Sequence, residues 1–269
     1  MQKSFLTSLI LVTLTSTTLN ATPVNITQDR LEKPRKTFST RRYSHVKNFF
    51  ANIASYSTTT CVEQNIPPAA LLAIAALESG WNRGYVGRIT GNILSLGLRK
   101  GDIRLPALTL PVVIESGKIL FDPEVIKTYK SSELRIEKRP PSLKKDYRPA
   151  PYTGSLDNLA YLDHHPKEKA KAQQQNIKDF VTIFVSRTSS IKAYRDTRAK
   201  MDRLVALHGK EILLKKETAL AFVYGIGGKK RSYNNHKAWP KKVEKIMKNA
   251  GLVDLTQKLY DKKSFKESW

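Results

Sequence analysis

The sequence predicts a mainly α-helical protein that carries a small β-containing insertion. Apolar residues recur at helical spacing in segments before residue 80 and after residue 174. Between about 98 and 158, seven prolines interrupt short apolar runs, which excludes long helices there. Within that region "VVIESGKILF" (112–121) predicts a hairpin that turns at Ser116 and Gly117.

The expected helices follow from these patterns. A first amphipathic helix spans 45–64, with Val46, Phe49 and Ile53 on one face. A second spans 69–78 and begins after two prolines, which suit the first turn of a helix. Because its nine residues 69–77 are all apolar, we expect protein to surround it. Helical periodicity returns at 174–188, 190–209, 216–228 and 237–260, whereas 138–152 reads as an extended basic arm.

The two ends of the chain have their own composition. Lys3 followed by the apolar run 5–14 and by Ala21 is typical of a secretory signal peptide, so we expect residues 1–21 to be a signal cleaved near Ala21. Residues 22–44 read as a flexible basic lead-in and 261–269 as a basic tail. One main domain over 45–260, with an insertion at about 98–175, lies between them.

The charge balance limits the classes of partner. The chain has 47 Lys and Arg against 23 Asp and Glu, a net charge of +24, and such a field attracts polyanions. The expected export signal favours anionic polymers of the cell envelope over nucleic acid. We expect a periplasmic or secreted monomer with no integral membrane association after cleavage. The single cysteine, Cys61, cannot form an internal disulfide, and no Cys/His spacing indicates a metal site, so no cofactor is expected.

Glu78 is the main candidate for chemistry. It follows the apolar run directly, and a poorly solvated carboxylate has a raised pKa, which suits a proton donor near neutral pH. Cleavage of a glycosidic bond needs such a general acid, because the leaving oxygen must be protonated. From spacing alone, a structural role for Glu78 as the ion-pair partner of Arg83 or Arg88 is an equal alternative.

Three stretches resemble a known family. "ALLAIAALESGWN" (70–82), followed by "GNILSLG" (91–97), resembles the signature of bacterial glucosaminidases of glycoside hydrolase family 73. "IKDFVTIFVSRTSSIKAYRDTRAKM" and "WPKKVEKIMKNAGLVDL" are similar to later stretches of the Bax-like branch of that family. The resemblance implies a lysozyme-like α-rich fold, peptidoglycan as substrate, and Glu78 as the catalytic acid of an endo-β-N-acetylglucosaminidase.

The same resemblance suggests substrate-binding residues. Tyr224 and Tyr233 stand where the family has a loop with an aromatic that lines the sugar cleft, and an aromatic face can stack on a pyranose ring. Trp81 can line a subsite. Asn92 matches the Asn of the family's Gly-Asn stretch and is a further candidate for substrate binding. Core packing is the alternative for Tyr224 and Trp81. Asn82 departs from the family, which has Gly there.

The second catalytic group has no firm assignment. The candidate carboxylates in the insertion are Asp102, Glu115, Asp122 and Glu124, and each one reads more readily as a surface residue. A distant carboxylate or the N-acetyl group of the substrate could take this role.

Other functions remain open at this stage. A lytic transglycosylase or a muramidase could use the same acid, although the Gly-Leu-Met-Gln stretch usual in transglycosylases is absent. A protein that binds the cell wall without cutting it would share the fold. A nucleic-acid binder rests on the net charge alone.

Overall fold

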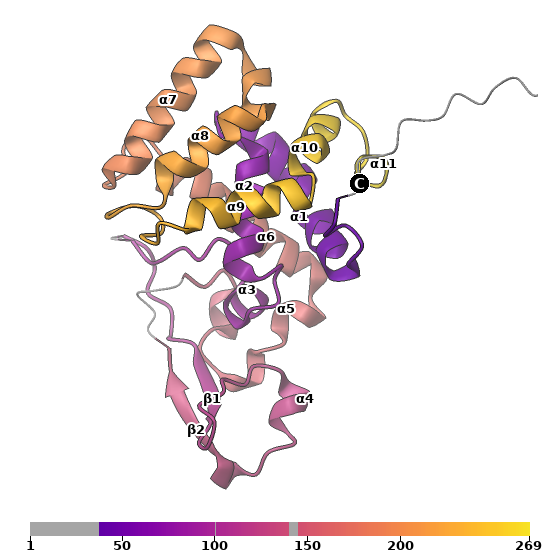
Figure 1. The fold of residues 1–269 in the computed structure, drawn as a ribbon. Helices are drawn as coiled ribbons and strands as arrows, with labels where there is room; N and C mark the ends of the chain where they lie inside the picture. The colour runs from indigo at the N-terminus through magenta and orange to yellow at the C-terminus, as the bar shows by residue number, and fades with distance from the viewer. Residues whose placement is uncertain (1–37, 100, 140–144) are drawn as a thin grey trace, which may run out of the picture. The chain divides into compact units, whose positions relative to one another are not determined.

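Helix α2 (Pro68–Ser79) is the element around which the other helices pack. The structure is a computed structural model that describes residues 38–99, 101–139 and 145–269, all within the unit Phe38–Trp269. Every residue of α2 from Pro68 to Ala76 is buried, which confirms the expected enclosure of this apolar helix. Its neighbours are α1 (Ser44–Glu63), α8 (Lys216–Ile226), α9 (Trp239–Asn249) and α10 (Leu252–Tyr260) (Figure 1).

Helix α1 follows its predicted amphipathic pattern. Phe50 and Ile53 on its inner face are among the largest fully buried side chains, and the outer face is polar. Cys61 near the end of this helix is buried, and burial raises the pKa of its thiol. The cysteine is therefore a small core residue rather than a reactive group.

The C-terminal half contains the other long helices. They are α6 (Pro166–Asp179), which continues into a π-helical turn at Phe180–Phe184, and α7 (Lys192–His208). The expected single helix over 237–260 is wrong, because the chain breaks at Gly251 between α9 and α10. Gly251 has φ +61°, a left-handed conformation that a helix interior does not contain. A short 3₁₀ segment, Lys210–Leu214, leads into α8.

The two ends of this unit pack on each other. Arg41 donates hydrogen bonds to the carbonyls of Ala250 and Gly251, and its guanidinium lies over the ring of Trp269. Helix α11 (Phe265–Ser268) brings Trp269 against Phe50. Residues 38–43 therefore differ from the expected flexible lead-in, and the expected basic tail, 261–269, contains α11 and packs on α1 through Trp269. The expected signal peptide, 1–21, lies outside the described residues.

The insertion holds the only sheet within the described residues. Strand β1 (Thr109–Val113) pairs antiparallel with β2 (Leu134–Lys138), with Pro111 opposite Ile136. The predicted hairpin at 112–121 exists only as a tight turn with one bridge, from Val112 to Ile119. The intervening chain forms α4 (Pro123–Ile126) and a 3₁₀ turn, Ser131–Glu133.

A second, smaller core attaches the insertion to the helices. Ile89 of α3 (Tyr85–Thr90), Leu110 of β1 and Leu159 form its buried centre. Two 3₁₀ turns, Ala150–Tyr152 and Leu156–Asn158, and α5 (Tyr161–His164) complete this region. Figure 1 shows α3 and α5 between the sheet and the helices around α2.

The predicted basic arm at 138–152 is more than a solvated segment. Within its described part, Arg148 is 3% exposed, is paired with Asp146 and donates to the carbonyl of Asn158. The described chain is thus mainly helical with a small antiparallel sheet, and none of its helices has the length and apolar character needed to cross a bilayer.

We predict that Leu72→Ala lowers the free energy of unfolding by about 2–5 kcal/mol, because Leu72 is fully buried and the truncation leaves a cavity. Chemical denaturation measures this change. Leu207→Ala is the matched control, since Leu207 is 75% exposed and its loss costs less than about 0.5 kcal/mol. Equal effects of the two substitutions would contradict the enclosure of α2.

Candidate functional site

Glu78 lies in the last turn of α2, where the buried helix reaches the surface. The chain reverses directly after it, because Gly80, Trp81 and Asn82 all have left-handed backbone angles (φ +56°, +55° and +61°). The Ser79 hydroxyl fixes this turn: it donates to the carbonyl of Ala75 and accepts from the backbone N–H of Asn82, at 2.7 and 2.9 Å. Left-handed Trp and Asn are uncommon, so this turn is a strained backbone segment next to the candidate acid.

Trp239 contacts the carboxylate of Glu78. The indole Nε1 donates a hydrogen bond of 2.8 Å to Oε1 of Glu78, which joins the end of α2 to the start of α9. Trp239 is 3% exposed, and its ring lies so close to Gly227 that a Cβ there would be 2.3 Å from it. The donor is thus held in place by close packing, and the partly buried carboxylate is held with it.

Two tyrosines lie close enough to Glu78 for its charge to act on them. Burial and then the negative charge of Glu78 raise the pKa of Tyr194 in α7 and that of Tyr233 before α9. Both phenols therefore stay protonated at neutral pH. Tyr233 donates to the carbonyl of Leu94, and its ring lies 5.3 Å from that of Trp239. We call Glu78, Tyr194, Tyr233 and Trp239 the Glu78 cluster.

The other predicted aromatics lie elsewhere. Trp81 is partly buried against the main core, and its ring meets His45 of α1 edge-on at 6.1 Å. Tyr224 is 45% exposed on α8, where its hydroxyl donates to Glu244 of α9 at 3.4 Å. The structure thus brings Tyr233 to Glu78, whereas the contacts of Trp81 and Tyr224 are with α1 and α9.

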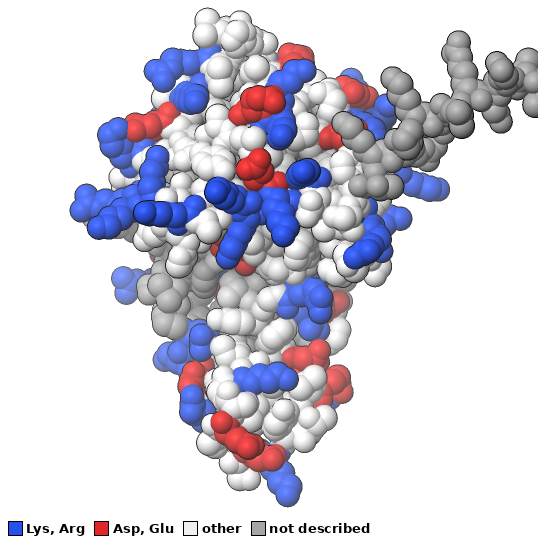
Figure 2. Space-filling view, in the orientation of Figure 1, with Lys and Arg blue, Asp and Glu red and all other residues white. Residues whose placement is uncertain are grey.

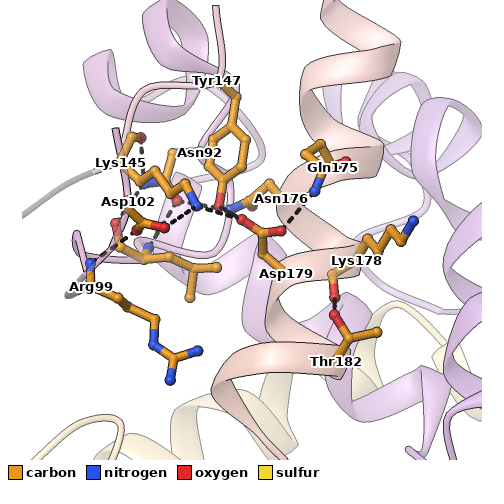
Figure 3. Close-up of polar contacts among 11 residues, drawn as sticks. Asn92, Arg99, Asp102, Lys145, Tyr147, Gln175, Asn176, Lys178, Asp179 and Thr182 are labelled. Atoms are coloured by element: carbon orange, nitrogen blue, oxygen red, sulfur yellow. Dashed lines mark hydrogen bonds and ion pairs between the residues drawn. The ribbon is translucent and has the colours of Figure 1, made fainter. Parts of the chain in front are cut away.

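Asn92 forms a buried network rather than an exposed subsite. Its amide nitrogen donates to the carbonyls of Leu96 and Lys145, and its oxygen accepts from Leu96 N–H and from Asn176 of α6 (Figure 3). It is 2% exposed. Protein groups therefore occupy the polar atoms with which it was expected to bind substrate, and its role in the structure is to shape the loop 91–97.

Asp102 is the candidate carboxylate that joins an ion network. Lys145 Nζ lies 3.1 Å from Asp102 and 2.9 Å from the buried Asp179 of α6, which also accepts from the hydroxyl of Tyr147 (Figure 3). Burial lowers the pKa of Lys145, but its contacts with Asp179 and Asp102 outweigh burial and leave that pKa raised. The lysine stays charged, so Asp102 serves as its counterion.

The remaining candidate carboxylates lie around the sheet. Glu115 is exposed at the turn after β1, and Glu124 pairs with Lys127. Asp122 caps α4 and pairs with Arg88 at 3.3 Å. Arg88, expected as a possible partner of Glu78, forms its ion pairs with Asp122 and Asp163 instead.

A pocket of about 500 Å³ opens between α3 and a set of described residues that lie within 98–99, 101–108 and 145–150, together with Arg139. Tyr85, Asp102, Arg139 and Arg148 supply polar groups among mostly apolar walls. No member of the Glu78 cluster lines it. Across the described ranges, no three His, Cys, Asp or Glu side chains come together as a metal site would require.

Sequence reasoning missed Tyr194 and Trp239. Both lie within stretches that resemble the family, Tyr194 in "SSIKAYRD" and Trp239 in "WPKKVEK". The sequence of those stretches indicated helices, but nothing in it shows that they approach Glu78. Tyr194 follows Glu78 by 116 positions and Trp239 follows it by 161. Each of these two stretches resembles the family and contains an aromatic residue, and that combination is the signal that could have identified Tyr194 and Trp239.

We predict that Asn92→Ala lowers the free energy of unfolding by at least about 3 kcal/mol, because several buried groups lose their partner. Thermal and denaturant unfolding measure the loss. Asn235→Ala is the control, since Asn235 is exposed and should change stability by less than about 0.5 kcal/mol. An Asn92→Ala protein of unchanged stability that no longer binds glycan would instead make Asn92 a binding residue.

Comparison with known proteins adds no family assignment. No family model, curated protein or solved structure matches the chain. The resemblance to glucosaminidases and the lysozyme-like fold stay predictions from the sequence motifs, and the mainly helical architecture with its small sheet is what the structure establishes.

Proposed function

We propose that this protein is a secreted or periplasmic peptidoglycan hydrolase that cleaves the glycan strand at N-acetylglucosamine, with Glu78 as the general acid. The observation that carries the proposal is the Glu78 cluster: one carboxylate at the end of a buried helix, bonded to an indole N–H and lying near two protonated phenols. A lysozyme-like arrangement of the helices is part of the same proposal.

The cluster supports acid catalysis through position and environment. The indole N–H fixes Oε1, so the carboxyl group has a defined direction. The carboxyl group is partly buried beside this indole, and reduced access to water suits a group that must hold a proton until a glycosidic oxygen arrives. Tyr194 is buried and the hydroxyl of Tyr233 donates to the carbonyl of Leu94, so both residues act on the environment of Glu78 rather than on a bound sugar.

Besides the acid, hydrolysis needs a group that activates water or stabilises the sugar cation. In inverting enzymes a second carboxylate lies about 6.5–9.5 Å from the acid. Asp102 is already paired with Lys145, and Asp122 with Arg88. Because Asp102 and Asp122 are held by these cations, we propose that the N-acetyl group of the substrate takes the place of an enzyme nucleophile.

We predict that Glu78→Gln lowers the rate of sacculus digestion by at least about 100-fold, the usual contribution of a general acid. The amide oxygen of Gln can still accept from Trp239, so the melting temperature should change little. Mass spectrometry of the digests measures the rate and identifies the bond. Glu63→Gln is the matched control, because Glu63 also ends a helix but is exposed, and this variant should digest normally.

The products separate the remaining functions. N-acetylglucosamine at the reducing end supports the proposal. Anhydro-muramic ends would indicate a lytic transglycosylase, and reducing muramic ends a muramidase. A wild-type protein that binds sacculi but releases no sugar would be a non-catalytic wall-binding protein, and the proposal would fail.

A further inference from the structure

The segment 227–249, which supplies Tyr233 and Trp239 to the Glu78 cluster, is also the most basic stretch of the described helical part. Its basic side chains are all exposed, and Glu244 is its only acidic residue. We call this set the basic ridge: Lys229, Lys230, Arg231, Lys237, Lys241, Lys242, Lys245 and Lys248. Figure 2 shows Lys and Arg gathered over α9 and over the loop that precedes it.

The ridge lacks close ion pairs within the described structure. The charge of Lys229 acts on Asp196 only at longer range, where it adds to the hydrogen bond from Lys192 in lowering the pKa of that carboxyl group. None of the eight side chains forms an ion pair with a described carboxylate, and Glu244 accepts from Tyr224 instead. Exposed lysines on other elements do form such pairs: Lys127, Lys171 and Lys192 lie 2.8, 2.9 and 2.5 Å from a carboxylate. Neighbouring cations that repel one another leave a positive field that attracts a polyanion.

The ridge has a regular geometry on α9. Lys241, Lys245 and Lys248 follow at i, i+4 and i+7, so they share one face of the helix. Val243 and Met247 turn the opposite side into the core. At 1.5 Å per residue the three charges extend over about 10 Å along the helix axis. Trp239 begins the same helix on its buried side, with Val243, so the helix that carries the ridge also supplies the indole that bonds Glu78.

We propose that the basic ridge binds the carboxylates of the peptide stems on the glycan strand that Glu78 cuts, an inference that rests on the proposed function. Seven of the eight cations are lysines, which act as mobile point charges and need no fixed geometry of the anion. The peptide stems of the proposed substrate carry carboxylates at intervals along the strand, and such dispersed anions match this set of point charges. Each contact is weak because it is exposed, but several contacts on one polymer together hold the strand on the enzyme.

The test uses two triple variants with the same change in net charge, both in the Glu78→Gln background so that sacculi stay intact. Lys241→Gln/Lys245→Gln/Lys248→Gln removes the α9 face of the ridge. Lys127→Gln/Lys171→Gln/Lys192→Gln removes three paired lysines elsewhere. In a sedimentation assay at low ionic strength, we expect the ridge triple to bind about five- to tenfold more weakly than the parent. The control triple should bind like the parent, and equal losses would overturn the proposal.

The chemistry of the partner is tested on the sacculus. Amidation of the peptide carboxylates should abolish the difference between the ridge triple and the parent, whereas acid removal of attached phosphate polymers should preserve it. The opposite pattern would overturn the assignment to carboxylates. Binding is measured apart from cleavage, so the two proposals can fail separately. If wild type cuts sacculi but the ridge triple binds them as tightly as the parent, this inference is wrong. If wild type binds sacculi through the ridge but does not cut them, the proposed hydrolysis is wrong.

Discussion

The hydrogen bond from Trp239 Nε1 to Glu78 Oε1 is the interaction on which the candidate site depends. It joins residues 161 positions apart and fixes the end of α2 against the start of α9. Trp239 in turn lies where Gly227 leaves room for its ring and where Tyr233 packs beside it. A change at any of these positions alters the direction of the carboxyl group, because close packing leaves the indole no alternative place.

The burial of α2 explains why the ionisable group stands at its end. A helix that is apolar on all sides is stable only when other helices enclose it, and here α1, α8, α9 and α10 do so. A carboxylate in its middle would have no water and no partner. At the last turn, Glu78 meets both the rigid interior and the surface, and the left-handed turn 80–82 then leads the chain away.

The local spacing of apolar residues predicted many of the helices. The features that it missed depend on contacts between residues that are far apart in the sequence. The helical spacing of Val46, Phe49 and Ile53 was enough to predict α1. The unbroken run of apolar residues was enough to predict α2 and its burial. The pairing of β1 with β2 crosses a gap of 20 residues that carries no turn signal joining the two strands. Glu78 was found because its helix is unusual in sequence, whereas Tyr194 and Trp239 reach it only through tertiary packing.

The most direct test of the account is a crystal structure of the Glu78→Gln variant with a bound fragment of the glycan strand. The account predicts a glycosidic oxygen about 2.6–3.2 Å from the amide of residue 78. A fragment that binds in the pocket between α3 and the segment 101–108, and makes no contact with residue 78, would contradict it.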